Sequence, residues 1–509
     1  MRHLGLVGLL ALACTHAVHA PSEGRDAAPE VQPEAAEDAS KATHPWTYSP
    51  LLEAWLPVSE QELSELRAES PGVVSVNGRA VWIALGGAGA RERLRAANGP
   101  LALHARLWEL QRDELSVINQ LAARFPVAIQ VVVTTRNLSR LASLTNIEGL
   151  ELSLVAGTGS SLDWTRLRRL KRLKVSVDSW QPLAGALPPN LEDLEVQSGA
   201  VNSADLERIS SLPKLRRLRF KTPGAGLELR KLVAPELEEL TLWDGVRSQD
   251  VATLSRFPKL RKLDAQGAQL SNAAVQHLVK LHALRDLDIS RSSIDATGVA
   301  KLSVLELRRL VPPRFTGPDY SSLVGFRHLR ELDLSGAHIH DSQLRVLRGL
   351  PELRSLNLAG TRISDAAAAT LLEFPLLQRL NLAYTSITGV TVRQLTALSE
   401  LQELNLQNIS VGEGDLDAFA QLQKLRVFTG TGISDRGLRA LAALPNLQGL
   451  VLDFGPEELD APALIADMHR LLTLRIESQT YSCRDFQALP VCWENLGEFQ
   501  YYAGSRVDE

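Results

Sequence analysis

The sequence has little charge imbalance and few aromatic residues. Its 55 Lys and Arg residues against 59 Asp and Glu residues give a net charge of −4, whereas a nucleic-acid-binding domain usually carries a marked basic excess. Aromatic side chains make up only 5% of the chain, so leucine must supply most of the core. Beyond the N-terminal segment no run of 18 apolar residues occurs, so no later segment is expected to span a membrane.

Motifs that carry catalytic or cofactor chemistry are also missing. We find no HExxH, no pair of CxxC motifs, no nucleophile elbow and no kinase loop. The stretch 86–89 (GGAG) resembles a dinucleotide-binding loop, but Glu92 stands where the third glycine belongs. His338 and His340 flank an apolar residue and lack the further ligands that a metal needs. We therefore expect neither enzyme activity nor a cofactor nor a metal.

The first 20 residues, MRHLGLVGLLALACTHAVHA, predict an export signal, because a short basic start precedes a brief apolar run. Two cleavage sites fit. A cut before Cys14 would leave a lipid-modified cysteine, and a cut near Ala17 would release the chain. Residues 21–45 are rich in Ala, Glu and Pro, so we expect a disordered tether. Of the three cysteines, Cys483 and Cys492 would remain; an exported protein is expected to bridge them, and two buried free thiols are the alternative.

Residues 126–480 are built from an internal repeat. LRSLNLAGTRIS at 353–364 returns as LQRLNLAYTSIT 24 residues later. Steps of 21 to 24 residues connect fifteen predicted first positions: Ile147, Leu170, Leu191, Leu215, Leu237, Leu260, Leu284, Leu307, Leu329, Leu353, Leu377, Leu401, Leu425, Leu447 and Leu471. Before the repeats, residues 46–125 predict an α+β capping region, with a hairpin at Asn77-Gly78 and helices at 90–97 and about 105–124. Residues 481–509 predict a C-terminal cap.

One repeat of this type predicts one strand and one short helix. Leu353, Leu356 and Leu358 alternate as a strand with its apolar side chains inward. Ser364 and Asp365 suit the start of a helix, because oxygen atoms there satisfy free N–H groups. Neighbouring strands lie about 4.8 Å apart and packed helices about 10 Å, so a stack of repeats must curve with its strands inside.

The pattern resembles the leucine-rich repeat family, in a short bacterial form with Thr-x-Ile-Ser-Asp in place of the usual Asn. The resemblance covers about 70% of the chain. It implies an α/β solenoid, a horseshoe with a concave parallel β-sheet and convex short helices. It also implies that a protein or peptide is the default partner.

On the concave face, the third residue of each repeat forms a row of alternating charge. Its members are Arg172, Asp193, Arg217, Glu239, Lys262, Asp286, Arg309 and Glu331, then Ser355, Arg379 and Glu403. The row is either a structural ladder of opposite charges or a surface for a partner of mixed charge. The fifth-residue row contains short polar acceptors, which either bind a cation or a sugar or are simply solvated.

The best candidate binding residues surround Trp243, which is expected near the concave surface. Arg219, Lys221, Asp264 and Gln266 are its expected neighbours, and an exposed Trp beside cations is a common interface anchor. Packing of Trp243 against a loop is the alternative. The repeat after Leu307 breaks the pattern (LRRLVPPRFTGPDYSSL), so its Phe315 and Tyr320 lie either in a tolerated irregularity or in a protruding partner-binding loop.

The sequence thus predicts a non-catalytic protein-binding scaffold of the bacterial cell envelope or exterior. Its membrane contact would be limited to a lipid on Cys14. Two alternatives remain: a structural or self-assembling envelope protein, and a set of substrate-receptor repeats serving an activity in residues 46–125.

Overall fold

The computed structural model describes most of the chain. The described residues are 73–76, 79–84, 101–106, 112–124, 127–155, 162–177, 185–198, 201–220, 227–242, 246–266, 268–315 and 320–453, with 465, 468, 471, 473–477, 492–494 and 501–502. The predicted export signal, the tether at 21–45, Cys14, Cys483 and the helix at 90–97 lie outside these residues. Cys492 opens a strand, but its side chain is not among those described.

The strands of the described residues form one sheet in which each strand pairs with the one before it in the chain. The pairing is parallel from β2 to β20, and β1–β2 and β20–β21 are antiparallel. The bounds are β1 Val73–Val76, β2 Arg79–Ala84, β3 Leu101–Arg106, β4 Val127–Thr134, β5 Gly149–Val155, β6 Arg172–Val177, β7 Asp193–Ser198, β8 Arg217–Phe220, β9 Glu239–Leu242, β10 Lys262–Asp264, β11 Asp286–Asp288, β12 Arg309–Val311, β13 Glu331–Asp333, β14 Ser355–Asn357, β15 Arg379–Asn381, β16 Glu403–Leu406, β17 Val427–Thr431, β18 Gly449–Asp453, β19 Thr473–Glu477, β20 Cys492–Glu494 and β21 Tyr501–Tyr502.

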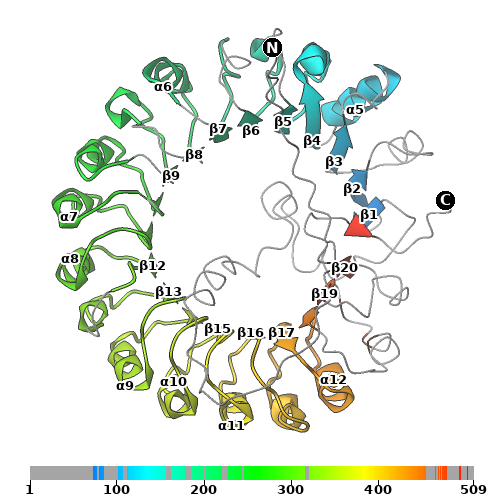
Figure 1. Ribbon diagram of the computed structural model, residues 1–509. Coiled ribbons are helices and arrows are strands. Elements are labelled where there is room, and N and C mark those ends of the chain that lie inside the picture. The colour runs from blue at the N-terminus through cyan, green and yellow to red at the C-terminus, as the bar shows by residue number, and fades with distance from the viewer. Residues whose placement is uncertain are drawn as a thin grey trace, which may run out of the picture.

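Helices occupy the outer side of the sheet, so the strands line the inner rim of a curved solenoid (Figure 1). The α-helices are α5 Arg112–Arg124, α6 Ser203–Ser210, α7 Asn272–Leu278, α8 Ala296–Lys301, α9 Asp341–Leu344, α10 Ala368–Leu371, α11 Gly389–Gln394 and α12 Asp435–Ala442. The 3₁₀ helices are Thr135–Ser143, Trp164–Arg166, Leu229–Lys231, Asp250–Arg256, Leu302–Val304, Ser321–Leu323, Arg345–Gly349, Asp365–Ala367, Leu395–Ala397 and Asp417–Gln421. The predicted horseshoe with a concave parallel sheet is confirmed.

The leucine pattern places every repeat in register. All fifteen strands from β5 to β19 begin two residues after the first position that the sequence predicted. In the repeat that begins at Leu353, the side chains of Leu353, Leu356 and Leu358 are buried, and so is that of Ile363. These leucines join one continuous core that runs through the described repeats. Each repeat buries its leucines against its two neighbours. A shift of one residue in strand register would expose these leucines, so their burial fixes the register.

The N-terminal side differs in part from the prediction. The hairpin at Asn77-Gly78 is confirmed, with Val76 opposite Arg79. The helix predicted over about 105–124 begins only at Arg112, and residues 101–106 form β3, parallel to β4. The sequence LALHAR alternates with period two, which suits a strand. The parallel ladder therefore extends to β2, beyond the repeats that the leucine spacing reveals.

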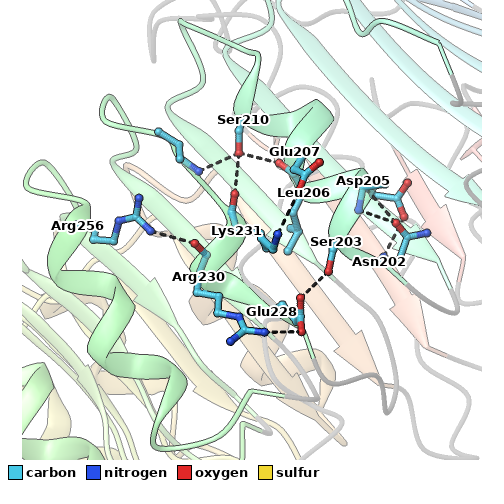
Figure 2. Close-up of polar contacts among 12 residues, drawn as sticks. Asn202, Ser203, Asp205, Leu206, Glu207, Ser210, Glu228, Arg230, Lys231 and Arg256 are labelled. Carbon is cyan, nitrogen blue, oxygen red and sulfur yellow. Dashed lines mark hydrogen bonds and ion pairs between the residues drawn. The ribbon is translucent and has the colours of Figure 1, made fainter.

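Polar contacts tie successive repeats together on the outer rim, as Figure 2 shows around α6. The Ser203 hydroxyl donates to Glu228, 25 residues on, at 2.5 Å. The Arg256 guanidinium donates to the carbonyl oxygen of Arg230 at 2.9 Å. Ser210 accepts the N–H of Val233 at 2.8 Å. The last two contacts pair backbone groups within and just after the 3₁₀ helix Leu229–Lys231 with side chains of the neighbouring repeats.

Asp365 makes a stronger contact of the same kind. Its carboxylate accepts the N–H of Thr388 at 2.8 Å and the Thr388 hydroxyl at 2.6 Å, both in the next repeat. It also accepts the Thr391 hydroxyl at 2.6 Å and the Thr391 N–H at 3.3 Å. Ser364 caps its own helix by accepting the N–H of Ala366. The predicted cap at 364–365 is thus confirmed for Ser364, while Asp365 connects two repeats.

Candidate binding surface

The third residues of the repeats lie side by side on adjacent strands. Strand pairing aligns Arg172 with Asp193, Asp193 with Arg217, and so on through the row. We call the aligned residues the charge row: Arg172, Asp193, Arg217, Glu239, Lys262, Asp286, Arg309, Glu331, Ser355, Arg379 and Glu403. The predicted alternation of charge across neighbouring strands is therefore confirmed.

Ion pairs form within the charge row. Arg309 lies 2.9 Å from Asp286 and 3.8 Å from Glu331. Arg379 reaches over the strand of Ser355 to Glu331, at 2.5 Å. For Arg309, burial alone would lower the pKa, but the charge and hydrogen bond of Asp286, together with the charges of Asp288 and Asp333, raise it. The alternating charges thus neutralise one another and hold their side chains in a fixed arrangement.

The short polar residues at the fifth position have a structural role. We call this set the Asx row: Asp264, Asp288, Asp333, Asn357, Asn381 and Asn405. In each, an Oδ1 atom accepts the backbone N–H two residues on, at 2.8 to 3.1 Å. Where the row is broken by Val311, the residue two positions on is Pro313, which has no N–H to satisfy. The Asx row therefore ends the strands, which accounts for its residue types without a bound cation or sugar.

Two members of the Asx row repel each other. Asp264 and Asp288 are paired on neighbouring strands. Burial and the Asp264 carboxylate together raise the pKa of Asp288 to about 6, although the N–H of Ser290 and the charge of Arg309 act in the opposite direction. Between pH 4 and 6 the folded protein consequently holds a proton that the unfolded chain releases, so stability falls as pH rises through this window.

Replacing Asp288 with Asn is expected to stabilise the protein at pH 8 by about 1–3 kcal/mol, from 1.4 kcal/mol per pKa unit. Asparagine keeps the Oδ1 acceptor, as Asn357 and Asn381 do, and removes the repulsion. The gain should disappear near pH 4, where the native carboxyl is protonated. Urea unfolding of both proteins at pH 4 and pH 8 checks this; an equal difference at both values would show that the pKa of Asp288 is not raised in the folded protein.

Of the five candidate residues around Trp243, the structure describes three. Trp243 and Lys221 lie outside the described residues. Arg219 and Asp264 lie in one row, on either side of Thr241, and Gln266 follows with its N–H bonded to Asp264. Arg219 lies 2.8 Å from Asp193 and 3.8 Å from Glu239. The structure thus brings Arg219, Asp264 and Gln266 to one part of the concave face.

The irregular repeat after Leu307 buries its two aromatic residues. Phe315 and Tyr320 are 5% and 1% exposed, and their rings meet edge to face with centroids 5.3 Å apart. Pro312, which stands where other repeats have an inward leucine, is also buried. Both rings therefore belong to the core. A partner-binding role for this loop stays a hypothesis about residues 316–319, which the structure does not describe.

Tyr384 occupies a corner where other repeats use residues that tolerate a positive φ. Its φ is 55°, against 63° for Gly336, 65° for Gly360 and 56° for Asn408. The Tyr384 side chain is 38% exposed. A bulky residue in this left-handed conformation carries backbone strain. The part of its ring that is buried contributes a stabilising term of opposite sign. The repeated glycine at this corner is a sequence signal that would have marked Tyr384 as unusual.

Replacing Tyr384 with Gly is expected to change the free energy of unfolding by less than about 1 kcal/mol, because the relief of strain and the loss of the ring's contacts oppose each other. The matched control is Gly432→Ala, at a φ of 63° with open space around the added carbon. It should cost about 1 kcal/mol from strain alone. Urea denaturation measures both; a loss above 1 kcal/mol for Tyr384→Gly would mean that the ring packs as a structural residue.

Among the described residues, no group of three or more His, Cys, Asp or Glu side chains could hold a metal ion. In the same part of the chain, no helix is long and apolar enough to cross a membrane. The features that stand out among the described residues are the two aligned polar rows of the concave face and the partly exposed Tyr384 at its corner.

Comparison with known proteins gives a family match and several fold matches. A family model described as a leucine-rich repeat region matches residues 228–448. No curated protein matches the chain. Matching solved structures include an internalin (InlF) from Listeria monocytogenes str. 4b F2365, with 20% identity over 68% of this chain and 90% of its own and a TM-score of 0.39.

Two further solved structures match. A leucine-rich repeat protein of Leptospira interrogans has 17% identity over 70% of this chain and 90% of its own, with a TM-score of 0.38. The plant peptide hormone receptor RGFR1, solved in complex with RGF2, has 13% identity over 78% of each chain and a TM-score of 0.33. The family match covers β9 to β17, which contain the whole Asx row and the charge row from Glu239 to Glu403.

Proposed function

Because residues 228–448 are a leucine-rich repeat region, we propose that this chain is a non-catalytic scaffold that binds a protein or peptide partner on its concave sheet face. The observation that supports this best is the charge row. Its side chains stand in fixed register on adjacent strands, and several keep a third or more of their surface exposed, such as Lys262, Glu331 and Arg379. A surface fixed before binding loses little conformational entropy on association.

The self-neutralised charge row favours a partner of mixed charge. An unpaired charge on the partner would meet an opposite charge on one strand and a like charge on the next, so only a matched pattern fits. The proposed contact residues are Arg219, Asp264 and Gln266 with Trp243 and Lys221. Tyr384 joins them as a second, separate contact farther along the face.

The location of the protein is part of the proposal. The N-terminal 20 residues support export in a bacterium, with the chain either anchored by a lipid on Cys14 or released by a cut near Ala17. Residues 46–125 and 481–509 would cap the two ends of the repeats, and a disulfide between Cys483 and Cys492 would brace the second cap. Mass spectrometry of the mature N-terminus separates the anchored form from the released form.

A second candidate function is a structural or self-assembling role, in which the same curved surface binds another copy. The polar rows do not distinguish a foreign partner from an identical one. A third places an activity in residues 46–125, with the repeats as substrate receptor; turnover of any substrate by the full chain would favour it.

The proposal is tested by co-precipitation with the native protein and a double variant, Trp243→Ala with Lys221→Ala. A binding surface should lose its partner while the urea midpoint stays unchanged. The matched control is Val390→Ser, which alters an exposed side chain at the start of α11 on the outer rim. Equal recovery of the partner by both variants, or recovery of only the chain itself, would favour the structural role.

A further inference from the structure

Arginine occupies the second position of five consecutive repeats, one residue before the charge row. After the first of them, the N–H of each donates to the carbonyl oxygen of the one before it, at 2.7 to 2.8 Å, so their backbones are stacked. We call this set the arginine row: Arg261, Arg285, Arg308, Arg330 and Arg354. Like charges side by side on neighbouring strands are destabilising. The arginine row therefore works against the fold at the very strands where the charge row pairs opposite charges.

The second and fourth members of the arginine row are neutralised within the chain. Arg285 pairs with Glu306 at 3.0 Å and also donates to the carbonyl oxygen of His282 at 2.9 Å. Arg330 pairs with Glu352 at 3.1 Å. These two guanidinium groups thus have partners of their own.

The first, third and fifth members have no such partner. Among the described residues, the side chains of Arg261, Arg308 and Arg354 make no hydrogen bond and no ion pair. Arg261 and Arg308 are exposed and Arg354 is half-buried. Three guanidinium groups on alternate repeats are therefore open to an anion from outside the chain.

The acidic residues near these three arginines are already bound to other cations. Glu306 and Glu352 each stand two residues before an unpaired arginine, yet each pairs with the arginine one repeat earlier. Glu238, whose carbonyl oxygen accepts the N–H of Arg261, has its carboxylate bonded to Arg216 at 2.6 Å. The carboxylates of the charge row bond to the cations of that row. To serve an unpaired arginine, any of these groups would have to break an existing pair.

We propose that Arg261, Arg308 and Arg354 bind an acidic segment of the protein partner whose carboxylates recur every third residue. Strands lie about 4.8 Å apart, so arginines on alternate repeats are about 10 Å apart along the row. A polyproline II segment has three residues per turn and rises about 9.3 Å in that turn, so every third side chain lies on one face at a matching interval. The planar guanidinium also suits a carboxylate, with which it forms paired hydrogen bonds.

The paired carboxylates of this edge favour a peptide over a continuous polyanion. Glu306 and Glu352 lie at the two intervening arginines, and a polymer with a charge on every unit would bring further anions beside them. A peptide with neutral residues between its carboxylates avoids that repulsion. This inference rests on the proposed function, since it assigns an acidic segment to the partner at the edge of the concave face.

The test uses a blocked seven-residue peptide, Glu-Pro-Pro-Glu-Pro-Pro-Glu, and measures its affinity for the full chain by isothermal titration calorimetry at low salt. The triple variant Arg261→Gln, Arg308→Gln, Arg354→Gln should weaken binding tenfold or more. It should not lower the melting temperature, because it removes like charges from neighbouring strands. A blocked peptide of the same composition with its glutamates adjacent, Glu-Glu-Glu-Pro-Pro-Pro-Pro, should bind the native chain at least fivefold more weakly.

The matched control removes the same charge from exposed arginines of the outer helices, with Arg166→Gln, Arg345→Gln and Arg439→Gln. It should change affinity less than twofold. The inference is overturned if the native chain does not bind the spaced peptide, if the clustered peptide binds as tightly, or if the control weakens binding equally.

Two further results would also overturn the inference. A lower melting temperature of the Arg261, Arg308, Arg354 variant would show that these arginines serve the fold. Tighter binding of a single-stranded DNA with the same number of charges, lost in that variant, would assign the row to nucleic acid. Failure here leaves the proposed function intact as long as the native partner is still lost from the Trp243→Ala, Lys221→Ala variant.

Discussion

Replacing Asp365 with Ala is expected to lower the free energy of unfolding by about 2–4 kcal/mol, because four hydrogen bonds from the next repeat lose a charged acceptor. Those bonds come from the N–H and hydroxyl groups of Thr388 and Thr391. In the variant, the fully buried Thr391 would lose its acceptor, whereas the exposed Thr388 could bond to water. Urea denaturation measures the loss, and hydrogen exchange should show the first turn of α11 opening before the sheet.

The same carboxylate predicts a pH dependence. Burial alone would raise the pKa of Asp365, but the hydrogen bonds from Thr388 and Thr391 outweigh it, so the pKa lies below its ordinary value. A lowered pKa means that the stabilisation is complete above pH 4 and is lost as pH falls toward the folded-state pKa. Native protein and Asp365→Ala should therefore converge in stability at low pH. A constant difference between the two proteins from pH 2 to pH 7 would contradict the assignment.

The control variant is Glu373→Ala, which removes only an exposed ion pair with Arg348. It should lower the free energy of unfolding by under about 0.5 kcal/mol.

Reversing the charge of Arg309 with Glu is expected to cost about 3–5 kcal/mol, the scale of breaking a buried ion pair. The Arg309 side chain is 22% exposed and lies between Asp286 and Glu331. Asp288 and Asp333 also act on it. In the variant, four carboxylates would face a fifth with no cation between them. The urea midpoint at pH 7 and at pH 4 measures the effect, which should shrink at pH 4 as these carboxylates are protonated.

The matched control for this reversal is Arg330→Glu, one residue before Glu331. Arg330 is 44% exposed and pairs with Glu352 at 3.1 Å, so its reversal should cost about 1 kcal/mol or less. Equal losses for the two variants would mean that the charge row contributes nothing beyond ordinary surface pairs.

The register of the repeats could be predicted from the sequence because each inward leucine is nearly fully buried. A one-residue slip would turn Leu356 and its counterparts to solvent, so the spacing of leucines alone places fifteen strands and the charge row. The N-terminal strand β3 could not be predicted in this way. LALHAR contains too few leucines to match the repeat, and its last two residues fall within the helix predicted over about 105–124.

The roles of polar residues were harder to predict, because they depend on partners one repeat away. Asp288 and Asn381 belong to the row of short polar acceptors that could, from the sequence, have bound a cation or a sugar. The hydrogen bonds that they accept from the backbone two residues on show that they cap strands. Phe315 and Tyr320 follow two prolines, a pattern that fits a protruding loop, yet both rings are buried, and Pro313 has no N–H that would need a partner.

Photo-crosslinking tests the central claim, that the concave face is the binding surface, most directly. A photoreactive phenylalanine analogue is placed at Ser355, within the charge row, or at Val390, exposed on the outer rim. The account predicts that a partner protein is crosslinked from position 355 and not from position 390. Crosslinking of the partner from position 390 alone, or equally from both positions, would contradict it.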